Sequence, residues 1–84
     1  MEAPPPELEV RGQTVDEALP TIDQYIDRAY LARLPWVRII HGRGTGTLRR
    51  VVRDLLAKHP LVQSYESGKL EEGGEGVTVV HLAE

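Results

Sequence analysis

Four stretches of the chain carry the residue patterns of β-strands. Residues 8–11 alternate apolar and charged side chains, so Glu9 and Arg11 are expected to face away from the core. Residues 36–41 form a nearly continuous apolar run after Pro35, which is typical of a central strand. Two further short strands are predicted over residues 61–66 and 77–82.

Two segments between these strands show the helical spacing of apolar residues. The first extends from Thr14 to about Arg33 and opens with a capping box that pairs Thr14 with Glu17. The second covers residues 47–58 and ends before Pro60, which cannot continue a helix. Both segments are therefore predicted to be amphipathic helices with one face in the core.

The order of these elements, β-α-β-α-β-β, predicts an α/β fold: a two-layer α/β sandwich with a four-stranded mixed sheet and two helices. A right-handed crossover makes the first two strands parallel, so their carboxyl ends lie at the same edge of the sheet. Polar, glycine-rich residues 67–76 predict a long hairpin loop. Residues 1–7 contain three consecutive prolines and are expected to be the end of a linker, with the domain over residues 8–84.

Composition narrows the class of protein. The 84 residues suffice for one small domain with a core of branched aliphatic side chains. With no cysteine, a disulfide scaffold, a thiolate zinc site and a cysteine nucleophile are excluded. No apolar run approaches the length of a membrane span, and the acidic, proline-rich start is unlike a signal peptide. We therefore expect a cytoplasmic protein with no membrane partner.

Charge is distributed unevenly along the chain. The formal net charge is -3, yet six of the ten Lys and Arg residues fall within residues 36–59, where Asp54 is the one acid. A basic segment in an acidic chain indicates a phosphate-binding face with a repelling back. The alternative is a solvated helix face without a ligand.

Candidate chemistry follows the first two strands. Successive amides of the loop from His41 to Gly46 can turn toward one anion, since glycine tolerates positive φ, and the next helix adds its positive end. The predicted ligand is a phosphate. The candidate phosphate-binding residues are Gly42, Gly44, Thr45, Gly46, Arg49 and Arg50.

The same edge of the sheet offers groups for phosphodiester hydrolysis. His41 titrates near neutral pH, Glu9 can orient it or hold a metal, and Arg11 and Arg43 can stabilise developing negative charge. In the competing interpretation, Glu9 and Arg11 form an ordinary surface pair and His41 bonds to the backbone. The glycines lack both the GxGxxG spacing and the Walker lysine, which disfavours ATP or dinucleotide binding.

Three ordered motifs resemble the Smr (small MutS-related) domain from Leu8 to the end of the chain. They are LEVRG from Leu8, HGRGTGTLR from His41 and GGEGVTVV from Gly73. Glu9 stands where the family pattern usually has aspartate. The resemblance points to Glu9, Arg11, His41 and Arg43 as catalytic or substrate-binding positions.

This resemblance implies a nicking endonuclease domain that acts on duplex or branched DNA. It implies the carboxy-terminal module of a bacterial MutS paralogue that suppresses recombination, fused to an upstream ATPase and dimerisation region. RNA and ribosomes are alternative partners, and a divalent metal, Mg²⁺ or Mn²⁺, is a candidate cofactor with Glu9 as its candidate ligand. Two other classes stay open: a non-catalytic nucleic-acid-binding module and a small nucleotide-binding regulator.

Overall fold

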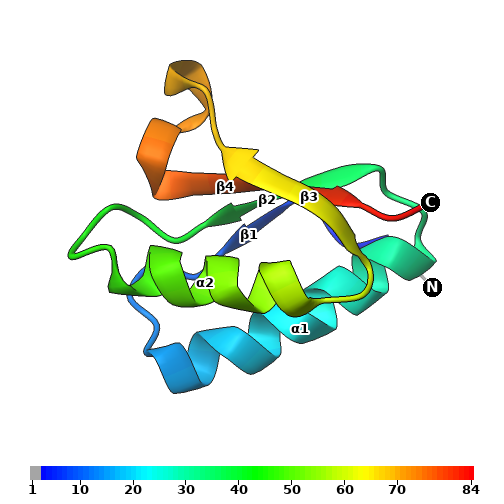
Figure 1. Ribbon diagram of the computed structural model, residues 1–84, viewed down its shortest axis with the longest axis horizontal. Coiled ribbons are helices and arrows are strands. Elements are labelled where there is room, and N and C mark those ends of the chain that lie inside the picture. The colour runs from blue at the N-terminus through cyan, green and yellow to red at the C-terminus, as the bar shows by residue number, and fades with distance from the viewer. Residues whose placement is uncertain (1–2) are drawn as a thin grey trace.

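The computed structural model describes residues 3–84 as two helices packed on one face of a four-stranded sheet (Figure 1). The strands lie in the order β1 (Glu7–Glu9), β2 (Trp36–Ile40), β4 (Val77–Leu82) and β3 (Val62–Ser67). β2 pairs parallel with β1 and antiparallel with β4, which pairs antiparallel with β3. The predicted two-layer sandwich, its element order and its mixed sheet are confirmed.

The first helix, α1 (Val15–Leu31), begins as predicted and ends slightly earlier. The Thr14 hydroxyl accepts from the Glu17 N–H at 3.2 Å, and the Glu17 carboxylate accepts from the Thr14 N–H at 2.8 Å. The helix stops before the predicted end because Arg33 adopts a left-handed φ of 62°. The N–H of Arg33 then donates to the carbonyl of Tyr30 at 2.9 Å.

The second helix, α2 (Thr47–Lys58), has the predicted bounds and covers the sheet beside α1. The core lies between the helices and the sheet and is aliphatic apart from one tyrosine. Within residues 3–84 no helix combines the length and the apolar character that a membrane crossing requires. The core residues are Val10, Ala18, Ile22, Tyr25, Ile26, Ala29, Val37, Ile39, Val52, Leu56, Val80 and Leu82.

The segment between β3 and β4 has more structure than the predicted hairpin loop. It contains two short 3₁₀ turns, η1 (Leu70–Glu72) and η2 (Gly74–Gly76). The turns pack closely on the start of β4, since a Cβ on Gly73 would lie 2.6 Å from a methyl of Val77. Sequence patterns missed them because 3₁₀ turns of this length bury no apolar stripe.

An ion network covers part of the sheet face that the helices leave open. The Arg38 guanidinium lies 3.2 Å from the Glu72 carboxylate and 3.6 Å from that of Glu7. It also stacks over the ring of Trp36, 4.8 Å from the ring centroid. Arg38 thereby connects β1, β2 and η1 on this face.

Part of the proline-rich segment packs against the domain. Pro4 is buried, the Tyr25 hydroxyl donates to the Pro5 carbonyl, and the Arg38 N–H donates to the Pro6 carbonyl at 2.8 Å. Burial, together with the charge of Glu7, raises the pKa of Tyr25 to about 12. Residues 1–2 of the predicted linker lie outside the described residues, and the linker role of residues 1–7 stays a prediction.

Two leucines near the ends of the two helices provide a matched test of this core. Leu56 is 1% exposed and Leu31 is 72% exposed. We expect Leu56→Ala to lower the free energy of unfolding by about 2–5 kcal/mol, because it leaves a cavity between α2 and the sheet. Leu31→Ala should change it by roughly 0.5 kcal/mol or less. Urea unfolding measures both, and equal losses in the two variants would contradict this core.

Candidate functional site

The loop between β2 and α2 lies at the end of the domain away from both chain termini (Figure 1). Its three glycines all adopt left-handed backbone angles, with φ of 78° at Gly42, 40° at Gly44 and 85° at Gly46. Residues with a Cβ rarely adopt these angles, so the glycine spacing is a requirement of this backbone path. The alternation of glycine with other residues allows neighbouring N–H groups to point into one concavity.

The amino terminus of α2 is open, unlike that of α1. Gly46 caps α2 without a side-chain hydrogen bond, and the first turn contains no acidic residue. The Thr45 hydroxyl reaches the Thr47 N–H only at 3.4 Å. In α1 the capping box and two acidic residues, Asp16 and Glu17, occupy the equivalent positions. The free N–H groups and the positive dipole end of α2 therefore remain available to an anion beside the loop.

The glycine loop is tied to η2 by one carbonyl. The Gly76 oxygen accepts from the N–H of His41 at 3.1 Å and from that of Gly42 at 2.9 Å. A Cβ at residue 76 would lie 3.5 Å from the Gly42 backbone, so the two chains run in close contact. The 41–46 loop and the 67–76 segment consequently form one surface.

The side chain of His41 is buried beneath this surface, with 4% of the residue exposed. Its Nδ1 lies 2.8 Å from the Gly42 carbonyl oxygen, and its Nε2 lies 2.8 Å from the Thr78 hydroxyl. Because a carbonyl only accepts, Nδ1 must carry the proton, and the neutral Nε2 accepts from Thr78. His41 thus links the end of β2 to β4.

The surroundings of His41 favour the uncharged ring. Burial lowers the pKa of His41, and the positive charges of Arg53 and Arg49 lower it further. The Gly42 carbonyl and the Glu75 carboxylate act in the opposite direction, more weakly than burial. The imidazole is therefore neutral at pH 7.

Glu9 and Arg11 lie at and just beyond the end of β1, beside the start of the glycine loop. Both are exposed, and Arg11 donates to both Glu9 oxygens, with Nη2 3.1 Å from Oε2. These hydrogen bonds lower the pKa of Glu9, which keeps its carboxylate ionised. The stem of Arg11 borders the glycine loop, since a Cβ on Gly42 would lie 3.1 Å from the Arg11 Cγ.

The hypothesis that Glu9 orients His41 is wrong in this structure. The parallel register pairs Glu9 with Ile40, so His41 lies beside Val10, whose side chain points to the helices. Side chains alternate between the faces of a strand, which places Glu9 and His41 on opposite faces. Both ring nitrogens of His41 are engaged by Thr78 and Gly42 instead.

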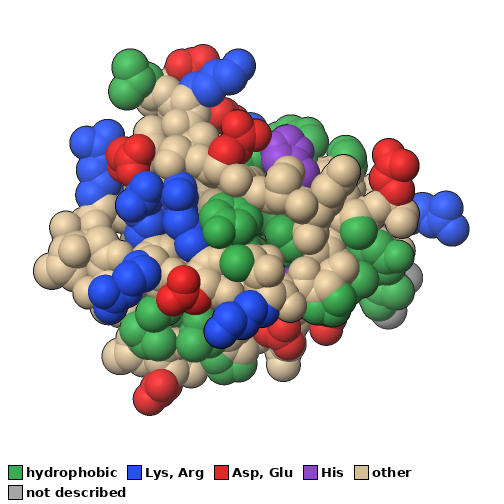
Figure 2. Space-filling model, viewed as in Figure 1, with side chains coloured by type: hydrophobic (Ala, Val, Ile, Leu, Met, Phe, Trp, Pro, Cys, Tyr) green, Lys and Arg blue, Asp and Glu red, His purple; other side chains and the backbone are tan. Residues whose placement is uncertain are grey.

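Three arginines surround η2. Arg49 binds the Glu75 carboxylate at 2.7 Å, and Arg53 donates to the Ser67 hydroxyl at 2.7 Å. The Arg43 guanidinium lies beside Gly74, since a Cβ added at that residue would be 3.2 Å from Arg43 Nη2. Figure 2 shows Lys and Arg side chains gathered at this end of the domain.

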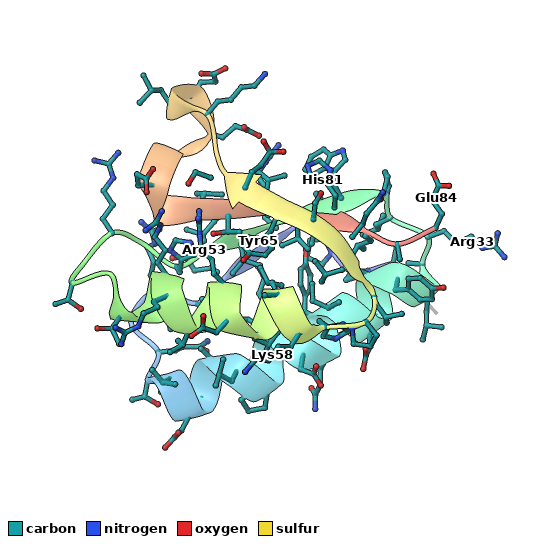
Figure 3. The ribbon with its side chains drawn as sticks, viewed as in Figure 1. Arg33, Arg53, Lys58, Tyr65, His81 and Glu84 are labelled. Atoms are coloured by element: carbon teal, nitrogen blue, oxygen red, sulfur yellow. The ribbon has the colours of Figure 1, made fainter. Side chains whose placement is uncertain are left out.

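Arg53 illustrates how α2 aims its basic residues. Its side chain points from the helix toward the sheet, beside Tyr65, with the guanidinium carbon 5.8 Å from the ring centroid (Figure 3). The Nε atoms of Arg49 and Arg53 are buried and have no hydrogen-bond partner. Within residues 3–84 these two donors therefore lack an acceptor.

Sequence reasoning missed four residues of this site: Arg53, Ser67, Glu75 and Thr78. Arg53 follows Arg49 by one helical turn, so the choice of Arg49 already indicated it. Thr78 is fully buried, and its alternation with Val77 and Val79 was a usable signal. Nothing in the pattern of residues 67–76 placed Ser67 or Glu75 against α2. Two predicted residues, Thr45 and Arg50, lie exposed at the start of α2.

Glu9 does not belong to a cluster of metal-ligating side chains in residues 3–84. Across residues 3–84 no group of three or more His, Asp or Glu side chains is placed to hold an ion. The Glu9 carboxylate is engaged on both oxygens by Arg11. Glu9 could therefore act only as a single carboxylate ligand, and its role as a metal ligand stays a prediction.

The chain is similar to parts of much longer curated proteins. It is 56% identical to endonuclease MutS2 of Thermomicrobium roseum over 77 residues. This match covers 92% of this chain and 10% of that protein. It is 52% identical over 79 residues to endonuclease MutS2 of Symbiobacterium thermophilum, a match that covers 94% of this chain and 10% of that protein. The chain thus spans about a tenth of the length of the curated relatives it matches.

Two solved structures share the fold. The Smr domain of Thermus thermophilus MutS2 superposes with a TM-score of 0.91 at 42% identity, covering 93% of this chain and 98% of that one. YdaL, a stand-alone small MutS-related protein from Escherichia coli, gives 0.90 at 28% identity, covering 94% and 65%. The Smr domain family model matches residues 8–83. With nearly the whole chain covered by that model, this chain belongs to the Smr domain family.

Proposed function

We propose that this domain is a nicking endonuclease that holds the sugar-phosphate backbone of duplex or branched DNA with little sequence preference. The observation that carries the proposal is the basic end of the domain. There the glycine loop, the open amino terminus of α2 and the guanidinium groups of Arg43, Arg49 and Arg53 lie together. Phosphate contacts of this kind position a nucleic acid without reading its bases.

The names of the relatives favour cleavage over binding alone. Both MutS2 proteins are named endonucleases, and the matched region is about a tenth of each. We extend the proposal to a cytoplasmic protein in which this module joins an ATPase and dimerisation region. The module would suppress recombination by cutting branched intermediates.

The residues divide the work of hydrolysis as follows. Loop amides and the α2 terminus hold the phosphate, while Arg43 and Arg11 neutralise the charge that develops in the transition state. Glu9, which is exposed and ionised, takes a proton from the attacking water. As the water oxygen bonds to phosphorus, the bond to one sugar oxygen breaks and that oxygen is protonated by solvent. His41 is a positioning residue, because its ring fixes the loop from below.

The burial of His41 favours a second candidate, a binding module that cuts nothing. With both ring nitrogens engaged, the imidazole has no free site for proton transfer. The same basic end would then deliver a larger protein to DNA, RNA or ribosomes.

Arg43 provides the most direct test of cleavage. We expect Arg43→Ala to slow nicking of supercoiled plasmid by about 100- to 1,000-fold, as the loss of a single charge-stabilising donor does in other enzymes. Arg28→Ala is the matched control, since Arg28 is exposed near the far end of α1. Gel quantification of nicked circles gives both rates. Equal rates for Arg43→Ala and Arg28→Ala would reject the role of Arg43.

The same assay separates the remaining alternatives. Arms with Mg²⁺, Mn²⁺ or chelator test the metal-dependent version, and a structured RNA of equal length tests the substrate. Wild-type protein that binds plasmid but leaves it intact in every arm would favour the binding module.

The burial of His41 also predicts a pH-dependent stability. Its pKa in the folded domain lies below the usual 6.5, so stability is complete above that value and is lost as pH falls. Between about pH 7.5 and about pH 5.5 the free energy of unfolding should decline, by at most about 1.4 kcal/mol per pH unit for one proton. His41→Gln should flatten this slope, whereas Leu31→Ala, which changes an exposed side chain that does not titrate, should keep it. Urea unfolding across this range would contradict the assignment if His41→Gln retained the wild-type slope.

A further inference from the structure

The Glu75 carboxylate occupies a position suited to an anion from outside. One oxygen lies 2.7 Å from Arg49 Nη2, and the other lies at 3.5 Å from the Ser67 hydroxyl, which itself accepts from Arg53. Arg43 passes beside the preceding residue, Gly74. Arg49 thus binds the Glu75 carboxylate directly, Arg53 reaches it through Ser67, and Arg43 lies beside the neighbouring residue.

Glu75 leaves two donors of the neighbouring arginines unpaired. Within the described part of the chain, the Nε groups of Arg49 and Arg53 are buried without a partner. An unpaired buried donor is costly, so a ligand with more acceptor oxygens would be preferred once the exposed Glu75 side chain moved aside. Phosphate offers such oxygens and matches the forked geometry of arginine.

The contact that holds Glu75 is weak enough to be displaced. The Glu75 side chain is 61% exposed and that of Arg49 is 35% exposed. Ion pairs this exposed contribute little, because solvent screens them. Gly73 and Gly74, with φ of 116° and 57°, form the backbone immediately before Glu75.

We propose that Arg49, Arg53 and Ser67 form a second anion subsite beside the glycine loop, which Glu75 fills in the free domain. A backbone phosphate of the bound nucleic acid takes the place of the carboxylate. The subsite deepens the proposed function and rests on it, since the phosphate belongs to the same backbone that the loop holds. Glu75 thereby lowers the affinity of the domain for nucleic acid.

The test compares two neighbouring acid-to-amide changes. Glu75→Gln removes the negative charge that Arg49 binds. Glu71→Gln makes the same change in net charge at an exposed position in η1. Binding of a fluorescein-labelled DNA duplex, measured by anisotropy at low salt, should tighten about two- to fivefold in Glu75→Gln. Glu71→Gln should tighten it clearly less. In an Arg49→Gln background the effect of Glu75→Gln should vanish.

The proposal is overturned by any of three results. Glu75→Gln binds no more tightly than Glu71→Gln; its gain persists without Arg49; or none of the proteins binds the duplex. Nicking by the wild-type protein is measured separately on the same preparations. Tighter binding by Glu75→Gln without nicking would reject the endonuclease proposal and keep the subsite. Nicking by the wild-type protein together with unchanged affinity in Glu75→Gln would reject the subsite and keep the endonuclease proposal.

Discussion

One carbonyl oxygen, that of Gly76, organises the functional end of this domain. It accepts from two successive amides, those of His41 and Gly42, at the point where β2 gives way to the glycine loop. The buried hydrogen bond between His41 and Thr78 also joins the end of β2 to β4, beneath the surface. Because both contacts join β2 to the chain before or within β4, the glycine loop and η2 cannot be arranged independently. The arginines of α2 then meet a surface whose shape is already fixed.

The fold was largely predictable because local signals and long-range packing agree. The capping box at Thr14, the helical spacing of α2 and the apolar run of β2 each specify one element, and the crossover fixes the parallel pair. The glycine loop could be predicted as well, since its spacing reports a backbone that only glycine adopts easily.

The site was predictable only in part. The prediction failed where it needed the facing of side chains: strand alternation separates Glu9 from His41, although both lie at one edge. It also could not reach Glu75, because the 3₁₀ turns of the 67–76 segment have no periodic pattern and are placed by contacts with Val77 and Gly42. A buried neutral histidine near Arg49 and Arg53 follows from this arrangement. The positive charge that we propose attracts a phosphate also disfavours protonation of the His41 ring.

The central claim is that nucleic acid is held at the end of the domain where the glycine loop meets η2. Titration of ¹⁵N-labelled domain with a short DNA duplex, followed by amide NMR shifts, tests it most directly. The account predicts the largest shifts in residues 42–46, the first turn of α2 and η2. Shifts confined to the open sheet face around Trp36 and Arg38, with the loop amides unmoved, would contradict it.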